Sequence, residues 1–216
     1  SSDRATQIET AAANDLYYAV VSGMLDDSQF EQYKSEPYFV GQIGPSMDTE
    51  YEAGYAMGKY YADKGIKSVG IYGAFIPNPM HVYRMAGVLV GLGCTYGGAS
   101  DEGGIVGQLF ADQGVDMSKV VCGDTETLSY LAGKYFSSIG PIFAATYAAV
   151  SGTPIRDAEG NAISISQSYL VATDAAGFDS IYSGDKGENP IFNKEVLDSI
   201  LENPTYDNLV AVVESK

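Results

Sequence analysis

Short β-branched runs alternate along this chain with longer segments in which apolar residues recur at helical spacing. This alternation is typical of a parallel sheet whose strands are joined by crossover helices. The pattern therefore predicts an α/β fold, a parallel sheet with helices on both faces. Six strands are predicted, over residues 16–22, 38–43, 68–73, 94–97, 119–122 and 164–172.

The clearest helix is predicted over residues 49–64. Apolar or small residues recur there on one face of a 3.6-residue period: Tyr51, Gly54, Tyr55, Gly58, Tyr61 and Ala62. A glycine inside a helix costs about 1 kcal/mol relative to alanine. Gly54 and Gly58, one turn apart on this face, therefore predict a close approach of the helix backbone to a sheet. Other helices are predicted over residues 79–91, 102–113, 139–151, 193–201 and 206–213.

Charge and composition narrow the classes of function. The chain has 216 residues, of which 45% are hydrophobic and 19% charged, as in a globular protein. Lysine and arginine number 12 against 28 aspartates and glutamates, a formal net charge of −16. Because this field repels phosphate backbones and anionic lipid, we expect no nucleic-acid partner. No apolar run approaches the roughly 20 residues of a membrane-spanning helix.

Few side chains are suited to catalysis. The single histidine, His81, excludes a multi-histidine zinc site, and we interpret it as a helix-start or loop residue rather than a catalytic base. Adjacent acids at Asp26 and Asp27, and at Asp101 and Glu102, are more typical of solvated turns than of a glycosidase pair. We therefore predict that the protein is not an enzyme, and we expect neither a cofactor nor a metal.

The two cysteines, Cys94 and Cys122, are 28 residues apart and form no CxxC pair. They permit either one disulfide or two separate buried thiols. We favour the buried thiols, and an extracytoplasmic location would permit the disulfide.

A series of motifs spans residues 37–93. A strand YFVGQI is followed by a helix AGYAMGKYYADKG, a second strand SVGIYG, a loop, and a helix that contains the RxxG motif at Arg84–Gly87. In this order they resemble type I periplasmic solute-binding proteins of ABC transporters. The segment KVVCGD at 119–124 and the helix and turn at 135–155 resemble later parts of the same family. Sugar-responsive bacterial repressors share this core.

The resemblance implies a two-lobe architecture that is shortened or partial here. It divides the chain into a remnant of the first lobe with its crossover (1–50), a second α/β lobe (51–151), and a return crossover with C-terminal helices (152–216). Ser2 and Asp3 would be the remnant of a ligand loop in the first lobe.

The resemblance also implies residues that contact a ligand. Arg84 matches the arginine of RxxG, and its alternative role is a salt bridge to an acidic residue. Asp124 matches a hydroxyl-binding aspartate at a strand end, and its alternative role is a helix N-cap. The other expected contacts lie in loops that follow predicted strands: Phe75, Asn78, Ser100 and Asp101.

The function implied is that of an extracytoplasmic receptor, lipid-anchored in the full-length protein. Such a receptor closes around a small polar solute, a sugar or a nucleoside-like molecule, and delivers it to ABC permease subunits in the membrane. Two alternatives remain open. One is the effector-binding domain of a sugar-responsive repressor, and the other is a small α/β hydrolase that uses His81.

Overall fold

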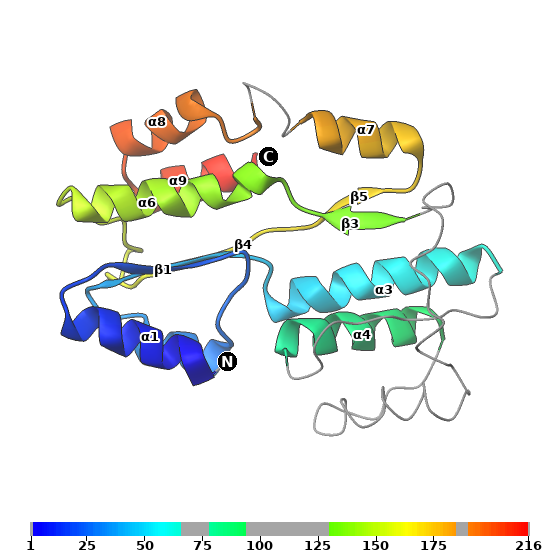
Figure 1. The fold of residues 1–216 in the computed structure, drawn as a ribbon, viewed down its shortest axis with the longest axis horizontal. Helices are drawn as coiled ribbons and strands as arrows, with labels where there is room; N and C mark the ends of the chain where they lie inside the picture. Colours follow the sequence, from blue (N-terminus) through cyan, green and yellow to red (C-terminus); the bar gives the residue numbers. More distant parts are fainter. Residues whose placement is uncertain (1, 66–77, 94–129, 185–189, 216) are drawn as a thin grey trace. The chain divides into compact units, whose positions relative to one another are not determined.

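The computed structural model describes residues 2–65, 78–93, 130–184 and 190–215 (Figure 1). The chain forms two compact units, which are described separately below. The first unit combines residues 1–49 with 132–216, and the second comprises residues 50–131. The assignment of the three predicted stretches to lobes stays a prediction.

The first unit is built on a parallel sheet of three strands. Its order is β1 (Tyr18–Val21), β2 (Phe39–Gly44) and β4 (Ile163–Ser166), and both pairings are parallel. Strand β2 lies in the centre, and all six of its residues are buried. A strand that is buried on both faces has a nearly continuous apolar sequence, and FVGQIG fits this pattern except at Gln42.

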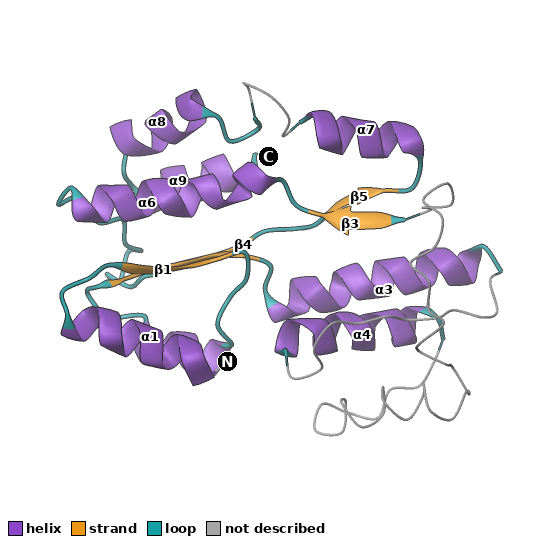
Figure 2. Ribbon diagram, viewed as in Figure 1, coloured by secondary structure: helices purple, strands orange, loops and turns teal. Residues whose placement is uncertain are grey.

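Helices cover both faces of this sheet (Figures 1 and 2). Helices α1 (Ser2–Ala13) and α2 (Asp27–Tyr33) pack on one face. Helices α6 (Gly140–Val150) and α9 (Tyr206–Glu214) cover the other, and α8 (Lys194–Glu202) packs against both of these helices. Two apolar clusters result, one around Ile8 and Phe39 and the other around Ile142, Ile163 and Leu209. The α/β class, with a parallel sheet flanked by helices, is thereby confirmed.

The predicted strand over residues 164–172 is in fact two strands, so that prediction is wrong in extent. Strand β4 ends at Ser166, and β5 (Leu170–Ala172) pairs with β3 (Leu131–Gly133) in a separate small antiparallel sheet. Residues 167–169 connect the two strands and belong to neither sheet. Helix α7 (Ala175–Ser183) follows β5, and its N-cap Asp174 accepts a hydrogen bond from the Gly177 amide at 2.7 Å.

Ser2 and Asp3 do not belong to a loop. Helix α1 begins at Ser2, so both residues lie in its first turn, and Asp3 is an acidic residue at a helix N-terminus. Negative charge is favourable in that position because the amide dipoles of a helix leave its N-terminus partly positive. The prediction that these residues are the remnant of a ligand loop is therefore wrong.

The second unit contains a pair of helices in close contact. Helix α3 (Met47–Asp63) confirms the predicted helix over 49–64, and α4 (Pro79–Gly91) confirms the one over 79–91. A Cβ atom placed on Gly54 would lie 1.9 Å from the backbone oxygen of Arg84, and one on Gly87 would lie 2.0 Å from that of Tyr51. The glycines of α3 thus allow close approach to α4, not to a sheet as predicted.

The remaining helix predictions in the described residues agree with the structure. Helix α6 fits the prediction over 139–151, and the 3₁₀ helix η4 (Phe136–Ile139) precedes it. Helices α8 and α9 agree with the predictions over 193–201 and 206–213 to within one residue at each end. The predicted elements at 68–73, 94–97, 102–113 and 119–122 lie outside the described residues, as do both cysteines.

Gln42 is the buried polar link across the sheet. Its side chain is 2% exposed, its Oε1 accepts a hydrogen bond from the Leu25 amide at 2.7 Å, and its Nε2 donates to Ser164 Oγ at 3.1 Å. We expect Gln42→Leu to lower the free energy of unfolding by about 2 kcal/mol, because it leaves the buried amide of Leu25 without its acceptor. Urea denaturation measures this change.

The control is Thr10→Leu, which removes an exposed polar side chain from helix α1 in the same unit and should leave the urea midpoint nearly unchanged. Equal effects of the two variants would contradict the role assigned to Gln42.

Candidate functional site

The carboxyl ends of β2 and β4 meet in a cluster of hydroxyl groups. Ser166 Oγ, on the last residue of β4, accepts a hydrogen bond from the Ser46 amide at 3.3 Å and lies 2.9 Å from Thr49 Oγ1. Thr49 Oγ1 is also 3.0 Å from Ser46 Oγ, which in turn accepts the Thr49 amide proton at the start of α3. Ligands of open parallel sheets bind at this edge, beyond the carboxyl ends of the strands.

A cavity of about 290 Å³ opens beside this cluster, where β4 gives way to β5. It lies within the first unit, and its walls come from four segments of the chain: the residues after β3, the β4–β5 connection, the loop before α8, and the end of α9. The lining residues are Lys134, Tyr135, Ser138, Ser166, Gln167, Ser168, Tyr169, Leu170, Phe192, Val213 and Glu214.

Gln167 fixes the wall formed by the β4–β5 connection. Its side chain is 9% exposed, and Nε2 donates a hydrogen bond to the Ser138 carbonyl at 3.3 Å. Its own amide donates to the Gly44 carbonyl at 2.9 Å, which extends the pairing of β4 with β2 by one residue. Gln167 therefore holds the start of the connection against both β2 and η4, and Ser168 follows it on the exposed side.

Burial raises the pKa of the Tyr206 phenol, which donates a hydrogen bond to the Ser164 carbonyl at 3.1 Å. The phenol therefore stays protonated at neutral pH and continues to donate. This contact attaches the first residue of α9 to β4, so α9 and the strand that ends at the cavity are held together.

The lining combines groups suited to a small polar molecule with an apolar face. Serine and tyrosine hydroxyls and the Gln167 amide are neutral donors and acceptors, Lys134 and Glu214 supply one charge of each sign, and Leu170, Phe192 and Val213 are apolar. Aromatic and apolar walls with a few polar groups are the usual composition of a small-molecule site. No histidine or cysteine lines the cavity among the residues described, so its walls offer no such nucleophile or base.

Arg84 lies on α4 in the second unit, where it pairs with an acidic residue. Its Nε and Nη2 donate to Oε2 of Glu50 at 2.8 and 2.5 Å, and the Glu50 side chain is fully buried. A buried carboxylate needs such a partner, because the uncompensated charge is costly to remove from water. The alternative role of Arg84 as half of an ion pair is therefore observed, and its role in binding a ligand stays a prediction.

Asn78 is the N-cap of α4. Its Oδ1 accepts a hydrogen bond from the Met80 amide at 3.1 Å, and Pro79 takes the first helical position. Capping accounts for an asparagine at this place, and a contact with a ligand stays a prediction. His81 lies in the first turn of the same helix. The other predicted contacts, Phe75, Ser100, Asp101 and Asp124, lie outside the described residues.

The adjacent acids at 26–27 have a structural role. Asp26 is the N-cap of α2 and accepts hydrogen bonds from the Ser28 hydroxyl and the Gln29 amide, at 2.7 and 2.8 Å. Burial by itself would raise the pKa of Asp26, but these hydrogen bonds stabilise the carboxylate and hold the pKa below its ordinary value. The structure therefore fits the interpretation of Asp26 and Asp27 as a turn feature better than their interpretation as a catalytic pair.

The described ranges contain no group of three or more histidine, cysteine, aspartate or glutamate side chains that could hold a metal ion. Among the helices described, none is long and apolar enough to cross a membrane. Comparison of the chain with models of protein families, with curated proteins and with solved structures finds no match.

Proposed function

We propose that this protein is a receptor that binds a small, neutral, hydroxylated solute, and that it is not an enzyme. The observation that carries the proposal is the cavity at the carboxyl end of β4. Its volume of about 290 Å³ is at the lower end of the range typical of small-molecule sites, about 300–1,000 Å³. A monosaccharide or a comparable polyol is the class of ligand that suits this size.

The polar groups of the cavity favour hydroxyl recognition. Ser138, Ser166 and Ser168 and two tyrosines each offer a hydroxyl that is both donor and acceptor, which matches the dual character of a sugar hydroxyl. Phe192 and Leu170 offer apolar surface for the carbon face of a ring. An anionic ligand is less favoured, because Glu214 and the net charge of −16 oppose it.

The resemblance of residues 37–93 to type I periplasmic solute-binding proteins supports the same class of function. On that basis we place the receptor outside the cytoplasm and assign it to an ABC importer, with the permease subunits as its partners. A receptor of this kind releases its solute unchanged, so solute recovered after binding should have its original mass.

The test is isothermal titration calorimetry with a panel of monosaccharides, polyols and nucleosides. We expect one or more panel members to give binding heat. Ser168→Trp should weaken that binding at least about tenfold, because the indole would occupy part of the cavity that the solute needs. A tenfold loss corresponds to about 1.4 kcal/mol of binding free energy. Ser168 is exposed and lines the cavity, so the variant should fold.

The control is Ser180→Trp, on the exposed surface of α7 in the same unit, and it should bind as the unchanged protein does. The absence of heat with every panel member would overturn the proposal, as would equal affinities of the two tryptophan variants. Chemical conversion of the solute would instead support the hydrolase alternative.

A further inference from the structure

Helix η4 and helix α6 together present a row of large apolar side chains to solvent. The row consists of Phe136, Ile139, Phe143, Tyr147 and Val150, hereafter the α6 stripe. Phe136 is 92% exposed, Phe143 and Val150 are each 67% exposed, and the other two are about half exposed. The opposite face of α6 packs into the core through Ile142, Ala145 and Ala149. The helix is thus apolar on all sides, which is typical of a helix covered on both faces.

The α6 stripe lies in a charge-free part of an acidic chain. No charged residue occurs from Tyr135 to Ile155, although the whole chain has a net charge of −16. The three exposed rings offer roughly 400 Å² of apolar surface, and the whole stripe roughly 600 Å². A patch of that size is at the upper limit for a monomer and is typical of a protein–protein interface.

The spacing of the stripe is symmetric about Phe143. Ile139 and Tyr147 are each four residues from it, and Phe136 and Val150 are each seven residues from it. A second copy of the same helix, antiparallel and related by a twofold axis through Phe143, therefore places Tyr147 opposite Ile139 of the other copy. Val150 then lies opposite Phe136 of the other copy. Self-complementarity of this kind is the requirement for a twofold interface.

We propose that the α6 stripe is the interface of a homodimer in which the two α6 helices pack antiparallel about Phe143. Two copies would bury about 1,200 Å² through the stripe, which reaches the lower end of the range for specific interfaces. Because both partners are strongly acidic, contact through an uncharged face avoids the like-charge repulsion that other faces would bring. A lipid surface is a poor occupant, since interfacial helices have lysine and arginine on their polar face and no such residue occurs between Tyr135 and Ile155.

The test is sedimentation velocity of the 216-residue chain over a range of micromolar concentrations. We expect a monomer–dimer equilibrium, with the dimer favoured as concentration rises. Ile139→Lys alone and Tyr147→Glu alone should each weaken the dimer at least about tenfold, because each places an unpaired charge in the interface. The double variant should recover most of the lost affinity, since the register sets the new ammonium against the new carboxylate of the other copy.

The control is Val171→Glu, which adds the same charge as Tyr147→Glu at an exposed position on β5 that is not part of the stripe. It should dimerise as the unchanged chain does, and circular dichroism should show that all variants are folded. A chain that stays monomeric at every concentration would overturn the proposal. A dimer whose affinity is unchanged by both single substitutions would also overturn it, as would a double variant that dimerises no more tightly than the single variants. Binding to lipid vesicles through the stripe, without self-association, would overturn it too.

Discussion

Replacing Arg84 with methionine is expected to lower the free energy of unfolding of the second unit by about 3 kcal/mol, because it leaves a buried carboxylate without its cation. The Glu50 side chain is 0% exposed, and both Nε and Nη2 of Arg84 donate to its Oε2. Methionine keeps most of the length and apolar stem of arginine but supplies no donor. Urea denaturation, followed by tyrosine fluorescence, measures the loss.

Two further variants make this prediction specific to charge. The double variant Glu50→Gln with Arg84→Met removes both charges, so it should be more stable than Arg84→Met alone. Lys59→Met, which breaks the exposed ion pair with Asp63 on α3, should change stability little. If Arg84→Met and Lys59→Met had the same small effect, the ion pair with Glu50 would not be a main support of α3 and α4.

The double variant Gly54→Ala with Gly87→Ala is expected to lower the free energy of unfolding by at least about 3 kcal/mol, because each new Cβ overlaps a backbone carbonyl of the facing helix. The overlaps would be at 1.9 Å with Arg84 and at 2.0 Å with Tyr51, and backbone atoms cannot move aside as the end of a side chain can. The helices would have to separate along their length. This loss exceeds the gain of about 1 kcal/mol per site that alanine brings to helix propensity.

Gly133→Ala is the control for this prediction, since a Cβ at Gly133 would meet no atom within 4 Å and its backbone angles suit alanine. It should leave the thermal midpoint within about one degree of the unchanged protein. Thermal melting by circular dichroism compares the two variants with the unchanged protein. A double variant as stable as the control would contradict the close packing of α3 against α4.

Much of the fold was predictable because its local signals are strong. The central strand β2 is apolar except for Gln42, and α3 and α4 have a clear helical period and good start signals, including Asn78 and Pro79 at the start of α4. The glycines of α3 correctly predicted a close backbone contact. They did not reveal the partner, because a glycine shows that something lies near, not whether it is a sheet or another helix.

Other elements had weak local signals. In α1 a single side chain, Ile8, is almost fully buried, so the apolar stripe that predicts a helix is nearly absent. The alternation of apolar and polar residues in ISISQSYLVA stops at Ser166, but the strand-like run YLVA begins only three residues later, so the sequence pattern did not separate β4 from β5. The two strands are distinguished by their partners, since β4 pairs with β2 and β5 pairs with β3.

The cavity was not predictable for a different reason. Its lining comes from segments as far apart as Lys134 and Glu214, and serine, glutamine and tyrosine are common in surface loops. No motif marks them, since recognition of hydroxyls needs no particular spacing along the chain. Sequence reasoning instead concentrated on Arg84 and Asn78, whose residue types are suited to binding but which hold α3 and α4 in place.

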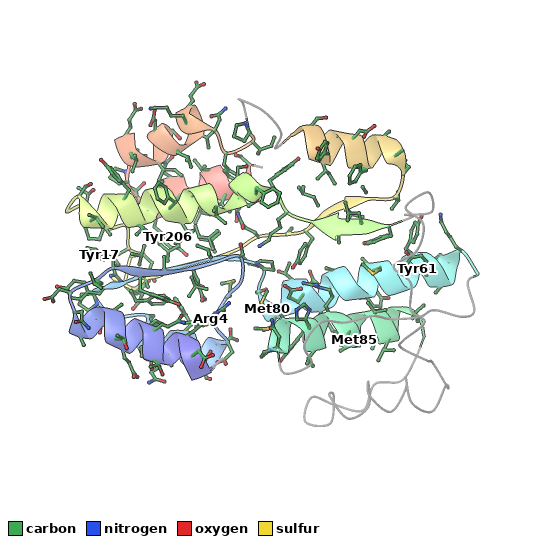
Figure 3. All side chains as sticks on the ribbon, in the orientation of Figure 1. Arg4, Tyr17, Tyr61, Met80, Met85 and Tyr206 are labelled. Atoms are coloured by element: carbon green, nitrogen blue, oxygen red, sulfur yellow. The ribbon has the colours of Figure 1, made fainter. Side chains whose placement is uncertain are left out.

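Figure 3 shows the described side chains on the ribbon and labels Tyr206, the first residue of α9, whose phenol donates a hydrogen bond to the Ser164 carbonyl of β4. The most direct test of solute binding there is a ¹⁵N–¹H correlation titration with the panel sugar that gives the largest heat. We predict saturable shifts concentrated in the amides of residues 134–138, 166–170 and 192, with little change in α1 and α2. Shifts confined to other regions, or none at saturating sugar, would contradict the assignment of this cavity as the binding site.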